Sequence, residues 1–251
     1  MLRPINPHGM SDSENVSIVY NITRNNGKRM RFDIELDPDT LEIVPNRRDD
    51  EGPEWTRIGN CRCRCCTLDP AVHRHCPNAA NMGDLMDFLR DAVSHEEVAV
   101  EVVTRERTTV KKTQLQAVAS SLMGIIMVSS GCPVLGKLRP MVEFHLPFAS
   151  WRETTYRTVT MYLFAQYFIY KKGDKPDWDL KHLVELFDDI KVVNVSFCRR
   201  LDTVRTNDAS VNSVNVLSSF GMLTRMAVDQ NELQHWENIF SSCFSDEAAS
   251  M

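Results

Sequence analysis

The sequence lacks any apolar run close to the roughly twenty residues that a membrane-spanning helix needs. Its opening residues, MLRPINPHGM, also lack the apolar core of a secretory signal. We therefore expect residues 1–13 to form a disordered tail and the protein to be cytoplasmic, with no membrane partner. There is no internal repeat and no low-complexity tract.

Several catalytic signatures are missing as well. The sequence contains no Walker-type phosphate loop, no GxGxxG and no GxSxG, so nucleotide hydrolysis, dinucleotide binding and serine hydrolysis have no motif to support them. An excess of basic residues is also absent, because 29 Lys and Arg stand against 34 Asp and Glu, giving a net charge of -5. Proteins that bind nucleic-acid phosphates are usually basic, and we do not expect a nucleic-acid partner.

Cysteine, by contrast, is plentiful and unevenly placed. Five of the eight cysteines lie between Cys61 and Pro77, in the stretch CRCRCCTLDPAVHRHCP, together with two of the seven histidines. In a reducing cytosol, clustered cysteines are more often metal ligands or catalytic groups than disulfides. The stretch follows neither helical nor strand periodicity and is predicted to be a loop.

The spacing of these cysteines is typical of zinc binding. Cys63-x-x-Cys66 is the usual chelating pair, because a tight turn brings both sulfurs to one ion, and Cys76 offers a third thiolate. A tetrahedral site needs a fourth ligand, which the loop does not supply unambiguously. His75 is one candidate, and Cys132 or His145 would be contributed by a distant part of the chain.

Other interpretations of the same residues stay open. Cys63, Cys66, Cys76 and Cys132 would also suit an iron–sulfur cluster. Cys132 stands before Pro133, a residue suited to the first helical position, so it would be the N-cap of a short helix, where a lowered pKa makes a thiol a redox sensor or nucleophile. The plainest alternative is a set of reduced thiols without any ligand role.

Alternating apolar residues predict strands over 16–22 and 30–36, joined by the turn Asn25-Asn26-Gly27. Further strands are expected over 98–102 and 107–112. Each pairing is expected to be antiparallel.

Helical spacing begins near residue 82 and dominates the second half of the chain. A capping box at Thr113 predicts a helix to about Ser130, and another at Ser150 predicts a helix to about residue 170. The latter is apolar nearly all round, so it should be the most buried helix. Asp179 is predicted to cap the next helix. The remaining helices are expected over 82–93, 208–227 and a final stretch ending near 244.

These motifs resemble those of a family of uncharacterised bacterial proteins, a domain of unknown function. The resemblance spans about 15–205 and implies roles for Cys63, Cys66, Cys76, Cys132 and His145, whereas Cys61 and Cys65 are additions of this chain. It rests on LDPDTLE (36–42), the Cys-x-x-Cys pair with Cys76-Pro77, SHEEVAVEVVT (94–104), SSLMG (120–124), SGCP (130–133), RPMVEFHLPFAS (139–150) and MYLFAQYF (161–168). The family carries no known activity, and the likeness implies a site without implying a reaction.

The expected fold class is α+β. Residues 14–112 should form an antiparallel β-rich part that carries the Cys/His loop 61–77, and 113–245 a helical bundle on which it packs, with both parts able to form one domain. The expected function is a bacterial zinc-binding module that acts through regulation or interaction with an unidentified protein partner. The alternative is an iron–sulfur or thiol-based redox sensor or enzyme using Cys132, and the sequence does not decide whether a reaction is catalysed.

Overall fold

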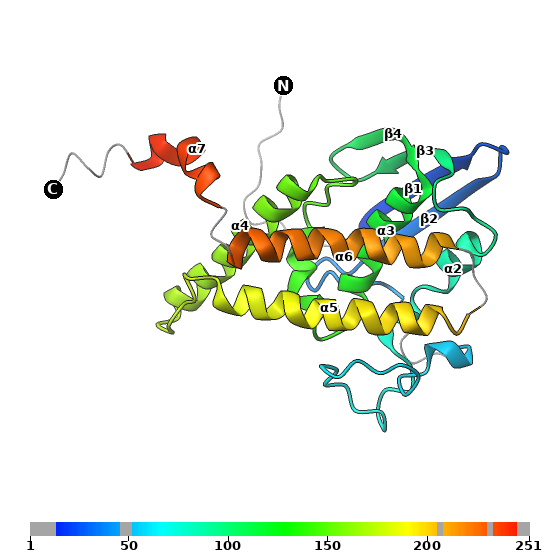
Figure 1. The fold of residues 1–251 in the computed structure, drawn as a ribbon, viewed down its shortest axis with the longest axis horizontal. Helices are drawn as coiled ribbons and strands as arrows, with labels where there is room; N and C mark the ends of the chain where they lie inside the picture. Colours follow the sequence, from blue (N-terminus) through cyan, green and yellow to red (C-terminus); the bar gives the residue numbers. More distant parts are fainter. Residues whose placement is uncertain (1–13, 46–51, 205–207, 230–232, 245–251) are drawn as a thin grey trace.

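The computed structural model describes residues 14–45, 52–204, 208–229 and 233–244 (Figure 1). A four-stranded antiparallel sheet comes first and helices follow, which confirms the predicted α+β class. The tail expected at 1–13 lies outside the described residues. Within the described residues, no helix combines the length and the apolar character needed to cross a membrane.

The sheet is built from two hairpins, and the strands lie in the order β2-β1-β3-β4. Ile18 pairs with Ile34 and Ile22 with Val100, so the buried side chains of neighbouring strands share one face. The turn between β1 and β2 needs a positive φ, which Gly27 provides at +81°. The strand bounds are β1 Val16–Arg24, β2 Arg29–Leu36, β3 Glu97–Val103 and β4 Thr108–Gln114.

Seven α-helices and two 3-10 helices are found in the described parts of the chain. Their bounds are η1 Glu54–Thr56, α1 Pro77–Ala80, α2 Gly83–Leu89, α3 Leu115–Ser129, η2 Leu135–Val142, α4 Trp151–Lys171, α5 Lys181–Leu201, α6 Asp208–Asp229 and α7 Gln234–Phe244.

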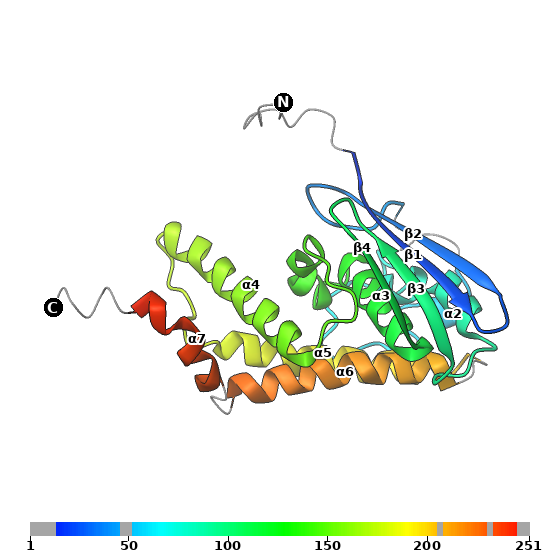
Figure 2. The same cartoon turned by 90° about the horizontal axis from the view of Figure 1, so that it is seen from above.

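The central helix is α3. It lies between the sheet and the long pair α5 and α6, so the molecule has three layers with α3 in the middle (Figure 2). Most of its side chains are therefore buried, and each buried leucine or isoleucine contributes about 1.5–3 kcal/mol of transfer free energy. The buried apolar residues of α3 are Leu115, Val118, Ala119, Leu122, Met123, Ile125, Ile126 and Met127.

Of the three helix starts predicted from Thr113, Ser150 and Asp179, two are wrong. Thr113 pairs with Val98 inside the sheet, so the helix begins two residues later and Gln114 is its N-cap. Leu180, with φ at 61°, precedes α5 in the place expected for Asp179. The capping box at Ser150 is confirmed, because its hydroxyl accepts from the backbone N–H of Glu153, whose carboxylate in turn accepts from the Ser150 backbone.

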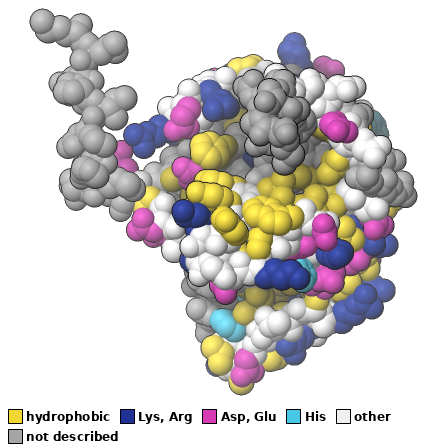
Figure 3. Space-filling view, turned by 90° about the vertical axis from the view of Figure 1, so that its left-hand side faces the viewer, with side chains coloured by type: hydrophobic (Ala, Val, Ile, Leu, Met, Phe, Trp, Pro, Cys, Tyr) yellow, Lys and Arg dark blue, Asp and Glu magenta, His cyan; other side chains and the backbone are white. Residues whose placement is uncertain are grey.

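The prediction that α4 is the most buried helix is wrong. Phe164 is 62% exposed and Phe168 is 50% exposed, although their rings pack on each other and on Tyr167. Figure 2 shows why: the second half of α4 extends away from the other layers. Figure 3 shows hydrophobic side chains gathered on this end of the molecule. Among the described helices, α7 stacks Trp236 and Phe240 on Tyr156 in the first half of α4, and the second half stays largely exposed.

Candidate metal site

The cysteine loop, defined here as residues 57–76, is closed at its neck. Arg57 and His75 form an isolated antiparallel bridge, and the backbone N–H of Cys76 donates to the Thr56 carbonyl across 2.8 Å. Figure 1 shows the loop in cyan beneath α5. Between residues 59 and 74 no side chain is buried, so the loop lacks a hydrophobic core of its own.

A single arginine of α5 attaches the neck to the helical part. Nη1 of Arg200 donates to the carbonyl oxygens of Trp55 and Arg57 across 2.6 and 2.7 Å. The side chain is 2% exposed, and these charge-assisted bonds satisfy two carbonyls that have no strand partner. Polar contacts therefore hold the loop neck, in addition to the packing of Cys63, Cys65 and Cys76 against the hydrophobic core.

Cys63 and Cys66 flank a tight turn, as their spacing predicts. The backbone N–H of Cys66 donates to the Cys63 carbonyl across 3.0 Å. Cys63 packs against the hydrophobic core and its thiol is hydrogen-bonded by Ser196 of α5, which lowers its pKa; burial has the larger effect and raises that pKa to about 12. This cysteine pair thus lies against α5.

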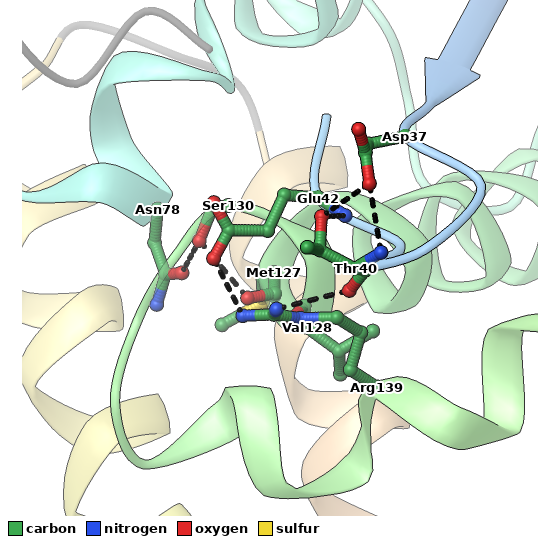
Figure 4. Close-up of polar contacts among 8 residues, drawn as sticks. All are labelled: Asp37, Thr40, Glu42, Asn78, Met127, Val128, Ser130 and Arg139. Carbon is green, nitrogen blue, oxygen red and sulfur yellow. Dashed lines mark hydrogen bonds and ion pairs between the residues drawn. The ribbon is translucent and has the colours of Figure 1, made fainter. Parts of the chain in front are cut away.

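Cys76 and Cys132 come from segments that are joined by a buried hydrogen bond. The Ser130 hydroxyl donates to Oδ1 of Asn78 across 2.6 Å, and it also contacts the Met127 carbonyl (Figure 4). Asn78 lies two residues after Cys76, and Ser130 lies two residues before Cys132. The bond therefore fixes the end of α3 beside the start of α1.

Cys132 is not the N-cap that the sequence predicts, because η2 begins only at Leu135, with Val134 as its cap. Its sulfur nevertheless accepts hydrogen bonds from the backbone N–H groups of Leu135 and Val134, which lower its pKa. Burial outweighs them and raises the pKa to about 11. A thiol in this setting is protonated at neutral pH unless a cation binds it.

The four thiols singled out by the sequence are neighbours in space. Negative charge on Cys76, Cys65 and Cys132 raises the pKa of Cys63, and negative charge on Cys76 and Cys66 raises the pKa of Cys132. For both thiols, burial is the largest cause of the raised pKa. The mutual effects show that loop, α1 and the segment after α3 bring these sulfurs within electrostatic range.

Proximity is not yet coordination. Among the described residues, no three His, Cys, Asp or Glu side chains are arranged to hold a metal ion. The convergence of Cys63, Cys66 and Cys76 at ligand distance therefore stays a prediction. An ion would need to draw the sulfurs together by rotations about their χ1 angles.

His75 has a defined hydrogen-bond partner. Its Nδ1 lies 2.7 Å from the Thr56 hydroxyl, which itself donates to the Pro53 carbonyl. A hydroxyl has one proton to donate, so Nδ1–H is the donor to Thr56 and Nε2 is left unprotonated. An imidazole held in this way through Nδ1 is the usual form of a metal-binding histidine.

The two extra thiols differ from the other four. Cys61 donates to Oδ1 of Asn60, and Cys65 donates to the Asp189 carbonyl of α5. A thiol that donates must keep its proton, whereas a metal ligand must lose it. Cys61 and Cys65 thus make donor contacts, although Cys65 lies close enough to Cys63 for its charge to raise the pKa of that thiol.

His145 lies in a different place. Its Nε2 is 2.7 Å from the hydroxyl of Tyr20, which also contacts Ser121 on α3. Burial lowers the pKa of His145 to about 3, with a further contribution from Arg157. The structure gives it a role in the core beside the sheet, and not among the cysteines.

Comparison with known proteins places the chain in a family. A family model described as "Domain of unknown function (DUF6901)" matches residues 18–241. The chain belongs to this family. The DUF6901 match covers the sheet, the cysteine loop and most of the helices. Searches among curated proteins and among solved structures found no match.

Sequence reasoning missed the side chains that position the thiols. Ser196 and Arg200 act across more than 130 residues, and no local pattern indicates such contacts. Asn78 and Ser130 lie next to the two Cys-Pro motifs, and that adjacency was the available signal.

Proposed function

We propose that the protein binds one zinc ion through Cys63, Cys66, Cys76 and Cys132. His75 is the alternative fourth ligand. The ion joins the cysteine loop to the end of α3 and to α5, and the protein acts as a regulatory or interaction module without turnover. Thiolate and imidazole ligands in this number are those that zinc prefers.

The observation that carries the proposal is the meeting of three separate segments at the thiols. A loop without a buried side chain between residues 59 and 74 gains little from hydrophobic burial, so a bound ion would supply its stability. The Asn78–Ser130 bond and the contact of Ser196 with Cys63 hold the ligand-bearing segments together. Such a preformed arrangement lowers the entropic cost of binding.

Partial burial of Cys63 and Cys132 also bears on the alternative, a redox or nucleophilic thiol. Reactive thiols have lowered pKa values, and both of these are raised. A bound divalent cation would lower these pKa values, because it stabilises the thiolates directly. The surroundings therefore favour a ligand role over a redox or nucleophilic role for Cys132.

The experiment is elemental analysis of protein purified without oxygen, comparing the wild type with Cys132→Ser. We expect one zinc per chain in the wild type, and a parallel loss of zinc and of thermal stability in the variant. Cys61→Ser is the matched control, because it lies in the same loop and its thiol is a donor; it should keep full zinc content.

Full zinc content and unchanged melting in Cys132→Ser would exclude this ligand, and Cys132 would then be a separate thiol. His75→Ala, measured in the same way, identifies the alternative. A brown protein that absorbs near 400 nm and contains iron would show that the same four cysteines hold an iron–sulfur cluster instead.

A further inference from the structure

A second candidate site lies on the other side of α5, enclosed by α3, η2, α4, α5 and α6. It is a cavity of about 480 Å³, within the range of small-molecule sites. Its walls are mostly apolar, with Phe148, Phe187, Ile190 and Leu217 among them. None of the proposed zinc ligands lines it.

The cavity exists because α3 presents small side chains here. Ala117, Ser120, Ser121 and Gly124 all line it. These small side chains leave room beside α3 although α6 packs closely on the same helix, where Cδ1 of Leu217 lies near Gly124. Well-packed interiors contain few voids of this size, so the space is unusual for a core.

Two cations line the cavity, Lys111 of β4 and Arg157 of α4, and no Asp or Glu does so among the described residues. Neither cation forms an ion pair with a described residue. Nη2 of Arg157 donates to the carbonyls of Met141 and Phe144, which fixes the guanidinium; burial lowers the pKa of Arg157, and the charge of Glu153 offsets this only in part. The nearby Glu153 carboxylate is engaged by Ser150 at the start of α4.

A polar atom without a hydrogen-bond partner is an independent indication that the cavity binds a ligand. Asn194 of α5 lines the cavity, is 3% exposed, and its Oδ1 has no hydrogen-bond partner among the described residues. Leaving such an oxygen unpaired costs about 1–3 kcal/mol. A bound molecule with a donor group, or a water carried with it, would satisfy this atom.

We propose that this cavity binds an amphipathic carboxylate, a small molecule with an apolar chain and one anionic head. The apolar walls accept the chain, and the head lies between Lys111 and Arg157. A half-buried guanidinium without a counter-ion is costly, and a carboxylate supplies the missing charge with two-point geometry. The inference does not depend on zinc.

The test is calorimetric titration of the full chain with decanoate, with decanol and acetate as comparison ligands. Decanoate should bind with saturation at one site and raise the melting temperature. Decanol has the same alkyl tail without the charge and should bind at least tenfold more weakly. Acetate has the same carboxylate without the alkyl tail and should show no binding.

A pair of adjacent lysines provides the matched variants. Lys111 pairs with Val100, whose side chain is buried, and Lys112 pairs with Ala99, whose side chain is exposed, so they lie on opposite faces of β4. Lys111→Glu should weaken decanoate binding at least fivefold, and Lys112→Glu should leave it unchanged. Both lysines are exposed, so neither change disturbs the core.

Ala117→Phe would fill the cavity from α3 and should abolish binding of decanoate while the fold is kept. Equal binding of decanol and decanoate, equal effects of the two lysine variants, or no saturable binding of decanoate would each overturn the proposal. If Ala117→Phe does not fold, the lysine pair decides the question alone.

Discussion

The hydroxyl of Ser130 and the side-chain oxygen of Asn78 form a buried hydrogen bond between segments that lie 52 residues apart. Both side chains are almost fully inaccessible to solvent. The bond links the segment that carries the cysteine at the start of α1 to the segment that carries the cysteine after α3. Its loss should therefore affect both the fold and the proposed zinc site.

Ser130→Ala should lower the free energy of unfolding by about 1–3 kcal/mol, because Oδ1 of Asn78 would be left buried and unpaired. Urea unfolding measures the loss, and competition with a coloured chelator measures zinc affinity. Ser129→Ala is the control next to it: the Ser129 hydroxyl is also buried but has no partner among the described residues, so its removal should be neutral or stabilising. Equal losses in the two variants would contradict the role of the bond.

Arg200→Leu should release the cysteine loop. The Trp55 carbonyl would lose its donor, at about 1–3 kcal/mol, whereas the Arg57 carbonyl would keep the backbone N–H of Asn60. Limited proteolysis should then cut within the loop much faster than in the wild type. Arg199→Leu, which replaces an exposed neighbour on the same helix, should leave the cleavage rate unchanged.

Phe164→Ser should change the free energy of unfolding by less than about 0.5 kcal/mol, because the ring is largely exposed on α4. Phe197→Ala on α5 removes a ring that is 2% exposed and should cost about 3–5 kcal/mol. Thermal and urea unfolding of the two variants compare the helices directly. A large loss in Phe164→Ser would mean that the outer face of α4 is covered in solution.

Acid should destabilise the protein through His145. The unfolded chain binds this proton near pH 6.5, whereas the folded chain binds it only near pH 3. Between these values the unfolded state holds the extra proton, so stability falls as pH falls, by up to about 1.4 kcal/mol per pH unit. Carboxylates also make the unfolding free energy depend on pH. The measurement is therefore the difference in unfolding free energy between wild type and His145→Gln. That difference should shrink steadily from pH 6.5 to 4.

The sheet could be predicted from sequence because its determinants are local. Alternation in β1 and β2 and the glycine of their turn act within a few residues, and the hairpin follows from them. The capping box at Ser150 is equally local. Thr113 shows the limit: the same motif appears there and a helix follows, but pairing with Val98 keeps Thr113 in the sheet, so Gln114 is the N-cap instead.

The burial of helices could not be predicted in this way. An apolar composition shows that α4 has surface to bury, but it does not show which neighbour will cover that surface. In the described structure α3 occupies the central position, and α4 extends past the layers. For the thiols, the sequence proposed Cys132 as a ligand from a distant segment, and that stays a prediction, while the contacts of Ser196 and Arg200 depended on the arrangement of α5.

The attachment of the loop neck by Arg200 has a consequence for biosynthesis. Arg200 follows Trp55 by 145 residues, so the loop leaves the ribosome long before its anchor is made. At about 5–20 residues per second, that interval is roughly seven to thirty seconds. During this time the loop's cysteines face the metal and oxidant pools of the cell before α5 exists to shield them.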